Sequence, residues 1–299
     1  MAKVDGKLLK SANGFFSVVN PYISDDWVQQ TYQMVSEQDF DQGAINEPIK
    51  HMNVLSRTLD HLRNLNGMCE VSIFDVGVYM GTFSIFASRI CDDLQLTPQI
   101  TCVEAMEVLK DSINANFLNY KLDSVTLILA ALSDADGENL TIGTRKGGLI
   151  GSTVVRPEIK AGNDGTLVEV ESLSLHTLLD RARTTHSLVK IDIEGNEVRA
   201  FNSISDNEAF LANNIFIIEF APWQTDQSFG DGDTYGGFLL DNFDIYNIRS
   251  WGAAQINSQI TAKQDLKNCL SNSNRQWNTD LLLIPKKMRN LGEALMLGR

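Results

Sequence analysis

Short apolar runs alternate with amphipathic segments from residue 71 onward, which predicts strands and helices that follow one another in turn. The runs are mostly apolar at successive positions, as is typical of strands buried on both faces of a parallel sheet. The predicted strands are Val71–Val76, Gln99–Val103, Val125–Leu132, Leu188–Ile193 and Ile215–Phe220, with Phe243–Ile248 and Leu281–Ile284 closing the sheet. The pattern therefore predicts a doubly wound α/β sheet.

Residues 1–68 have a different pattern. Apolar side chains recur there at three- and four-residue steps, which places them on one face of a helix. They are Met52, Leu55, Leu59, Leu62 and Leu65. A weaker helix is predicted from about Asp25 to Val35, with Ser24 as its cap. We therefore expect a helical N-terminal extension over residues 1–68 and one α/β domain over residues 69–299.

Composition and charge narrow the class of protein. The chain has 299 residues, of which 43% are hydrophobic and 21% charged, as expected for a soluble globular protein. Its formal charge of −13 repels phosphate backbones, so no nucleic-acid partner is expected. The four cysteines form no CxxC motif, which fits reduced thiols in a cytoplasm. We find no signal peptide and no apolar stretch long enough to span a membrane, so we expect a cytoplasmic location.

The first candidate for chemistry is a glycine turn after the first strand. Gly77 and Gly81 have GxxxG spacing, one residue short of the pattern that cradles a dinucleotide pyrophosphate. The missing side chains would let a ligand approach the backbone. Asp75 precedes the turn, and a carboxylate there suits a ligand with a cationic amino-acid end. This favours S-adenosylmethionine over NAD, although a purely structural tight turn is an alternative.

Two further segments end at the same predicted edge of the sheet. Glu104 closes the second strand, where doubly wound folds present an acid to the ribose hydroxyls of a nucleoside. Ala131 and Leu132 end the third strand and are followed by Asp134, where a backbone amide and a short carboxylate could read an adenine edge. A surface acid and an ordinary turn are the structural alternatives for these two segments.

The fourth segment is the most charged of the predicted strand ends. Lys190, Asp192 and Glu194 share one side of an extended strand, which is costly in a buried position unless the charges are paired or functional. Asp192 and Glu194 are the candidate general bases, and Lys190 would orient them or the substrate. Glu219 is a further acid on the next strand, and with the other two acids it could gather around Mg²⁺, although no spacing demands a metal. A structural lysine–carboxylate network is the alternative.

With these residues in place, the chain resembles the FkbM family of S-adenosylmethionine-dependent methyltransferases. The segments that carry the resemblance are Phe74–Gly81, Val103–Glu104, Ala131–Asp134 and Lys190–Glu197. The resemblance implies a Rossmann-like class I methyltransferase sheet of seven strands, the last antiparallel, and O-methylation of a hydroxyl on a small metabolite or saccharide. Two positions depart from the family pattern: Tyr79 replaces the usual Asn, and Ala105 replaces the usual Pro.

These arguments together assign a site. The predicted catalytic residues are Asp192, Glu194 and Lys190. The residues predicted to bind S-adenosylmethionine are Asp75, Gly77, Tyr79, Gly81, Thr82, Glu104, Ala105, Ala131, Leu132 and Asp192. Two other functions stay open at this point. One is a nicotinamide-dependent oxidoreductase, against which the glycine spacing argues, and the other is a non-catalytic protein that keeps the methyltransferase fold.

The acceptor would be a small molecule or a saccharide. We expect its specificity to reside in residues 1–68 and in two loops, Gly143–Thr166 and Pro222–Asp241, which contain the glycine pairs 147–148 and 236–237. Aromatic side chains in the second loop, those of Trp223, Phe229 and Tyr235, are candidates for stacking on the acceptor.

Overall fold

The computed structural model describes residues 7–10, 17–20, 52–67, 69–122, 124–145, 148–154, 166–220, 232–248, 258–266 and 279–291. The helix predicted from about Asp25 to Val35 lies outside these residues, as do Trp223 and Phe229.

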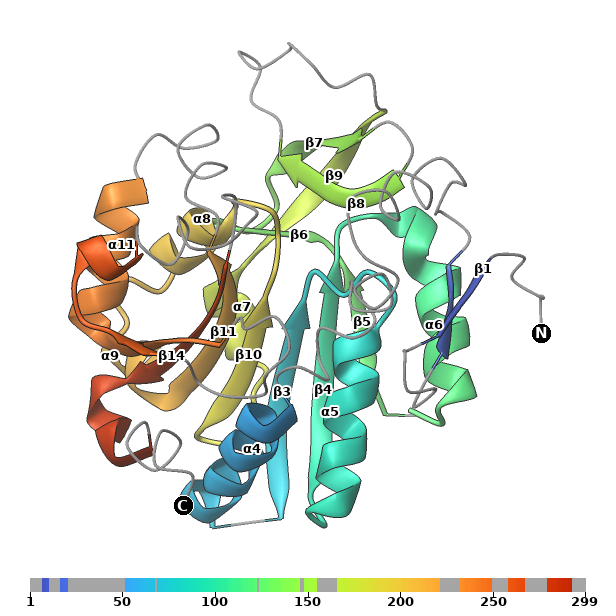
Figure 1. Ribbon diagram of the computed structural model, residues 1–299. Helices are drawn as coiled ribbons and strands as arrows, with labels where there is room; N and C mark the ends of the chain where they lie inside the picture. Colours follow the sequence, from blue (N-terminus) through green and yellow to red (C-terminus); the bar gives the residue numbers. More distant parts are fainter. Residues whose placement is uncertain are drawn as a thin grey trace.

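A central sheet of eight strands has the order β13-β12-β14-β11-β10-β3-β4-β5 (Figure 1). The strands are β3 (Glu70–Val76), β4 (Thr97–Glu104), β5 (Thr126–Leu129), β10 (Ser187–Ile191), β11 (Asn214–Phe220), β12 (Phe243–Asn247), β13 (Ser258–Ile260) and β14 (Thr279–Pro285). Strands β5, β4, β3, β10 and β11 are parallel to one another. Strand β14 is antiparallel to both β11 and β12. The predicted doubly wound sheet with its last strand antiparallel is confirmed, and β13 is an eighth strand that was not predicted.

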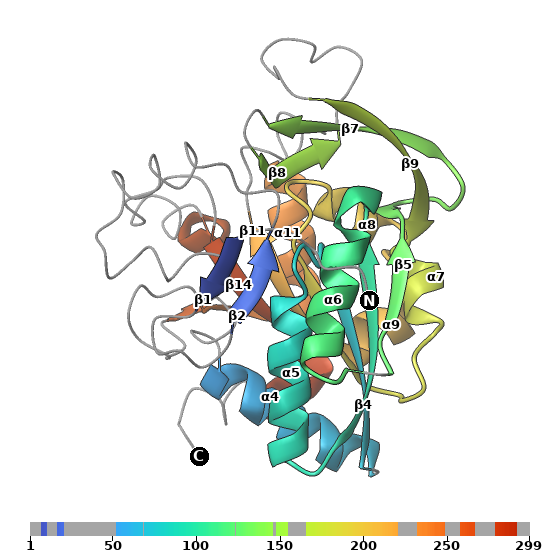
Figure 2. The same cartoon turned by 90° about the vertical axis from the view of Figure 1, so that its right-hand side faces the viewer.

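Helices cover both faces of this sheet (Figures 1 and 2). On one face lie α4 (Met52–Asn66), α5 (Thr82–Asp93) and α6 (Lys110–Asn119), and on the other lie α7 (Leu175–Leu179), α8 (Glu197–Asn202), α9 (Glu208–Asn213) and α11 (Gly232–Asn242). Strand alternation separates the two cores: Ile215 and Ile217 of β11 pack toward α4 and α5, whereas Phe216 and Ile218 pack toward α8 and α11. Both faces of the strands are therefore apolar, as the sequence pattern predicts.

A second sheet lies beyond the carboxyl ends of the central strands (Figure 1). It has the order β6-β9-β7-β8 and consists of β6 (Ala131–Ser133), β7 (Asn139–Arg145), β8 (Gly148–Val154) and β9 (Leu167–Ser174). Two predictions are corrected here. The single strand expected over Val125–Leu132 is divided, because β5 pairs with β4 whereas β6 pairs with β9. The expected loop Gly143–Thr166 contains β8 and the end of β7.

The expected loop Pro222–Asp241 is also corrected. Its second half is α11, so Gly236 and Gly237 lie inside a helix. Tyr235 is buried and packs against Phe201 and Phe220. It therefore contributes to the core and does not present its ring to an acceptor.

The N-terminal extension is only partly helical in its described residues. Strands β1 (Lys7–Lys10) and β2 (Ser17–Asn20) form an antiparallel hairpin beside α6 (Figure 2). The predicted helix is present as α4, and its buried leucines share one core with the central sheet. Two short 3-10 helices, η1 (Glu107–Leu109) and η2 (Lys286–Met288), complete the regular structure of the residues described here. Among the described helices, none has the length and apolar character that a membrane span needs.

Candidate functional site

The candidate site is built where the neighbouring parallel strands β10, β3 and β4 end. Their last residues are Ile191, Val76 and Glu104, and parallel strands present their carboxyl ends at one edge of a sheet. The glycine turn follows β3, and Gly77 and Val78 donate backbone hydrogen bonds to the carbonyl oxygen of Val103. The topology therefore brings three of the four predicted segments together.

Gly77 and Gly81 both have a positive φ, +76° and +77°. A Cβ on Gly77 would lie 1.8 Å from the backbone oxygen of Asp192, and one on Gly81 would lie 2.4 Å from the ring of Phe117. This corrects the reason given for the two glycines, because the space of each missing side chain is filled by this protein and not left to a ligand. The glycines let the loop after β10 and helix α6 approach the turn closely.

Tyr79 lies between these glycines and also has a positive φ, +51°. Non-glycine residues adopt this left-handed conformation rarely, and Asn is among those that tolerate it best. This explains in physical terms why the family pattern favours Asn here and why Tyr79 is a departure. Tyr79 still directs its backbone N–H to the Glu104 carboxylate, at 2.8 Å.

Glu104 is held from two directions. Its Oε2 accepts from Tyr79 N, and its Oε1 accepts from Met106 N at 2.9 Å. Burial raises the pKa of Glu104, while these two hydrogen bonds act in the opposite direction. A carboxylate has about four lone-pair sites, so acceptor sites remain for further donors. Neither backbone partner was part of the sequence prediction, because a backbone N–H leaves no signal in residue type.

Asp75 lies beneath the turn and is completely buried. Ser84 Oγ on α5 donates to its Oδ2 at 2.6 Å, and Lys190 Nζ lies 3.8 Å from its Oδ1. Burial raises the pKa of Asp75, and the charge of Lys190 opposes that shift. The predicted contact of Asp75 with a cofactor stays a prediction, since the structure shows its carboxylate engaged with Ser84 and Lys190.

Lys190 connects the glycine turn to the candidate base. Its Nζ donates to the carbonyl oxygen of Gly77 at 3.0 Å and lies 3.3 Å from Asp192 Oδ2. The lysine–carboxylate network, which the sequence left as an alternative, is therefore present. The network lies at the carboxyl edge of the sheet, and a catalytic role for its residues stays a prediction.

Strand β10 ends earlier than the alternation argument assumed. Asp192 follows its last residue, and Glu194 has a φ of +55° in a turn, so the predicted strand does not continue to Ile193. The carboxylates of Asp192, Glu194 and Glu219 nevertheless offer oxygens within 4.8 Å of one another. Burial raises the pKa of Glu219, and the charges of Asp192 and Glu194 raise it further.

Oxygen ligands of this kind suit Mg²⁺, which the sequence left open. The Lys190 ammonium already lies beside Asp192 and supplies positive charge there. A role for Mg²⁺ and a role for Asp192 as a base both stay predictions.

Glu197 and Asn196 support the loop after β10. Glu197 is buried, and its Oε1 accepts from Ile193 N at 3.0 Å, as expected for a residue that braces the loop. Asn196 donates from Nδ2 to the carbonyl oxygen of Leu132, which ties this loop to β6. Ala131 and Leu132 are thus placed close to the loop, and both are buried.

The remaining predicted residues fall around this core. Thr82 begins α5 directly after the glycine turn, and Ala105 follows Glu104 and is partly buried. The Asp134 carboxylate is paired with Arg199 of α8, which also lies 3.0 Å from Glu138. That pairing favours a structural role for the Asp134 side chain over contact with an adenine edge.

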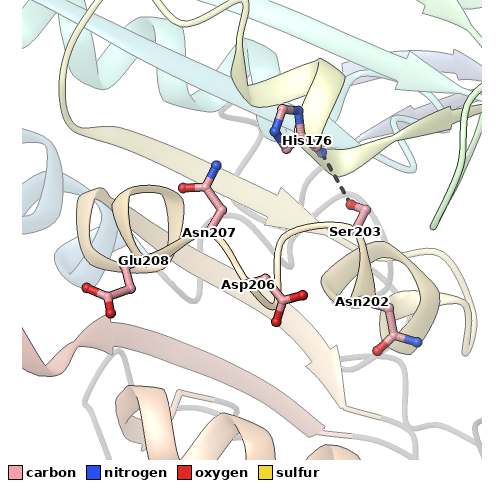
Figure 3. Close-up of a pocket in the computed structure, with 6 residues that line it drawn as sticks. All are labelled: His176, Asn202, Ser203, Asp206, Asn207 and Glu208. Carbon is pink, nitrogen blue, oxygen red and sulfur yellow. Dashed lines mark hydrogen bonds between the residues drawn. The ribbon is translucent and has the colours of Figure 1, made fainter.

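A polar cavity of about 440 Å³ lies elsewhere, between α7 and the α8–α9 connection (Figure 3). It is lined by His176, Asn202, Ser203, Asp206, Asn207 and Glu208. The connection leads to Asn214 at the start of β11, so this cavity is remote from the carboxyl edge where the candidate residues gather. In the cavity wall, His176 N donates to Ser203 Oγ at 3.3 Å.

Several solved structures are similar in fold to this chain. The methyltransferase FkbM from Methylobacillus flagellatus KT has 13% identity and a TM-score of 0.42, with 88% of this chain and 56% of that chain covered. This chain thus spans little more than half the length of that protein. A precorrin-6y C5,15-methyltransferase from Geobacter metallireducens GS-15 has 13% identity and a TM-score of 0.36, with 77% and 87% covered. Cofactor-bound Rv0187 from MTB has 12% identity and a TM-score of 0.32, with 90% and 98% covered.

No curated protein matches the sequence. A family model described as the methyltransferase FkbM domain matches residues 75–251. The match begins at Asp75, continues through the glycine turn, Glu104 and the Lys190–Glu197 segment, and includes β11 and β12. Because it covers more than half of the sequence, this chain belongs to the methyltransferase FkbM domain family.

Proposed function

We propose that this protein transfers the methyl group of S-adenosylmethionine to a hydroxyl of a small metabolite or saccharide. The observation that carries the proposal is the position of Lys190 Nζ, 3.0 Å from the Gly77 carbonyl oxygen and 3.3 Å from Asp192 Oδ2. The glycine turn, called the donor turn below because we propose that it binds the methyl donor, and Asp192, the predicted base, are thus joined by one side chain. The glycine spacing and the family membership both argue against a nicotinamide-dependent oxidoreductase.

Glu104 and the glycine turn fit the cofactor. Glu104 presents a carboxylate whose orientation is fixed by two backbone N–H groups, and its free lone pairs suit ribose hydroxyls. We propose that Gly77, Tyr79, Gly81 and Thr82 surround the amino-acid end, and that Ala105, Ala131 and Leu132 lie toward the adenine. When bound, S-adenosylmethionine supplies an electrophilic methyl group.

The residues of the chain then have distinct tasks. Asp192 takes the proton of the acceptor hydroxyl, for which its carboxylate must lie within about 2.6–3.2 Å of that oxygen or one water away. Glu194 is the second candidate for this task. Lys190 keeps Asp192 beside the turn, so that donor and acceptor are aligned for an in-line displacement. We propose a small-molecule or saccharide acceptor and, from the charge of −13, no nucleic-acid partner.

The test compares ligands and two variants. S-adenosylmethionine and S-adenosylhomocysteine should raise the melting temperature of the protein, whereas NAD should not, because only a ligand of the native state stabilises it. Glu104→Ala should weaken S-adenosylhomocysteine binding by roughly 1–3 kcal/mol in calorimetry, because ribose hydroxyls lose a charged acceptor. Unchanged affinity in Glu104→Ala would contradict the assignment.

Methyl transfer is tested with a tritium-labelled methyl group and a panel of saccharides and hydroxylated metabolites. Asp192→Asn should keep cofactor affinity and lose turnover by about 10²–10⁴-fold, the usual effect of removing a general base. Full turnover in this variant would move the role to Glu194 or Glu219. Turnover that is lost on chelation and restored by Mg²⁺ would favour the metal alternative. Cofactor binding without transfer to any acceptor would favour the non-catalytic alternative.

A further inference from the structure

Asp75 is an unusual site residue because its carboxylate is closed to solvent. Its exposed fraction is 0%, and its Oδ2 is occupied by the Ser84 hydroxyl at 2.6 Å. Its Oδ1 accepts no hydrogen bond from any residue that the structure describes, and the nearest cation is Lys190 Nζ at 3.8 Å. A buried carboxylate is costly unless a positive charge compensates it. Lys190 is placed to do so.

The sheet register explains why these two residues meet. Asp75 of β3 and Lys190 of β10 are direct partners in a parallel pair, so their side chains emerge side by side on one face of the sheet. That face is covered by α5, from which Ser84 approaches. The pairing is therefore built into the strands and does not depend on a loop.

The ammonium group of Lys190 also contacts two oxygens outside Asp75. They are the carbonyl oxygen of Gly77 in the donor turn and Oδ2 of Asp192. The side chain of Lys190 is only 16% exposed, whereas that of Asp192 is 32% exposed. The exposed fraction of these charged side chains thus increases from Asp75 through Lys190 to Asp192, from the core toward the proposed reaction site.

We propose that Asp75 is a positioning residue that acts through Lys190, holding its ammonium between the Gly77 carbonyl and Asp192, and that it does not bind the cofactor's amino-acid end directly. This inference rests on the proposed function. Ser84 fixes the far oxygen of Asp75, so that the near oxygen faces Lys190. Loss of the Asp75 charge frees the ammonium and loosens both the donor turn and the base.

Two ligands distinguish positioning from direct contact. S-adenosylhomocysteine carries the amino-acid end, whereas 5′-methylthioadenosine shares its adenosine and thioether but lacks that end. Calorimetry with Asp75→Asn should show both affinities lowered, by about tenfold for a change of 1.4 kcal/mol. Both ligands are affected because the turn that Lys190 contacts also orients Glu104, the proposed ribose ligand, through Tyr79 N. Direct contact would lower the affinity for S-adenosylhomocysteine alone. A selective loss of that kind would overturn the proposal.

A double-mutant cycle tests whether Asp75 acts through Lys190. Asp75→Asn should lower S-adenosylhomocysteine affinity in the wild-type background but add no further loss to Lys190→Met. Lys190→Arg, which keeps the charge, should recover part of the affinity that Lys190→Met loses. A merely structural pair would be coupled in stability but not in the affinity of the folded variants. Equal losses in both backgrounds would overturn the proposal.

Control variants distinguish a folding defect, and a failure of the proposed function, from a failure of the proposal for Asp75. Asp93→Asn removes an exposed carboxylate from α5 and should leave both affinities unchanged. If Asp75→Asn does not fold, Ser84→Ala keeps all charges and should produce a smaller loss of affinity for both ligands. Wild-type protein that binds neither ligand would overturn the proposed function and this inference together. Wild-type binding with a selective loss in Asp75→Asn or Ser84→Ala would overturn this inference alone.

Discussion

Gly77 and Gly137 both have a positive φ, but their surroundings differ. A Cβ on Gly77 would lie 1.8 Å from the Asp192 backbone oxygen, whereas one on Gly137 would meet no atom within 4 Å. Gly137→Ala should therefore lower the free energy of unfolding by only about 1 kcal/mol, the cost of placing a side chain in the left-handed conformation. Gly77→Ala should cost several times as much, because backbone atoms must move. Equilibrium urea unfolding of both variants measures the difference, and equal losses would contradict the close approach of the two loops.

Glu197 should make stability depend on pH. Burial raises the pKa of its carboxyl from an ordinary 4.5 to about 8, and the charges of Asp192 and Glu194 act in the same direction. The folded state then holds the proton more tightly than the unfolded chain does. The free energy of unfolding should therefore fall as pH rises from about 5 to about 8.

Glu197→Gln tests this dependence, because the amide keeps an oxygen for the Ile193 N–H and cannot ionise. The variant should be more stable than wild type near pH 9, and the difference should shrink toward pH 5. Urea unfolding across this range gives the slope, with the exposed Glu107→Gln as control. If the free energy of unfolding depended on pH with the same slope in wild type and Glu197→Gln, the raised pKa of Glu197 would be refuted.

The sequence predicted which residues gather at the candidate site, but it did not predict their contact partners. The sequence places Glu104, Lys190 and Asp192 at strand ends, and the parallel sheet brings those ends together. Ser84 was missed because a serine inside an apolar helix has no distinctive pattern, although it bonds Asp75 directly. The turn at Glu194 was missed because alternation was assumed to continue past Ile191.

At the scale of elements, the cap of α9 offers a clear test. Asn207 Oδ1 accepts from Phe210 N at 3.1 Å and so satisfies one N–H of the first turn. Asn207→Ala should lower the free energy of unfolding by about 1 kcal/mol, whereas Asn207→Ser should keep the cap and most of the stability. Thermal and urea unfolding measure both variants. An equal loss in the two would show that capping is not the cause.

Strands buried on both faces were predicted more accurately than partly exposed ones. Strands β3, β4, β10 and β11 are mostly apolar, and their existence follows from that pattern. Strand β7 carries polar residues at alternate positions and contains Gly143, and its end falls in the predicted loop Gly143–Thr166. Strands β5 and β6 form one run in sequence, and only their pairing with different partners separates them. Pairing is a tertiary property that a local pattern does not contain.

At the scale of the whole molecule, α4 does not stand apart from the domain that follows it. Leu55, Leu59 and Leu62 are fully buried in the core that also contains Ile73 of β3 and Ile85 of α5. The boundary predicted at residues 68 and 69 therefore does not separate two cores. The helix and the sheet should unfold in one cooperative transition.

Two leucines on α4 provide the matched test of this cooperativity. Leu59 is 0% exposed and Leu65 is 40% exposed. Leu59→Ala should lower the free energy of unfolding of the whole protein by about 2–5 kcal/mol, since it leaves a cavity in the shared core. Leu65→Ala should change it by less than about 0.5 kcal/mol.

Circular dichroism follows the helices, and near-ultraviolet signals follow the aromatic core around Phe201 on the opposite face of the sheet. Both signals should shift together in Leu59→Ala, because loss of packing under α4 lowers the stability of every element that shares the sheet. Separate transitions would show that α4 folds as an independent unit.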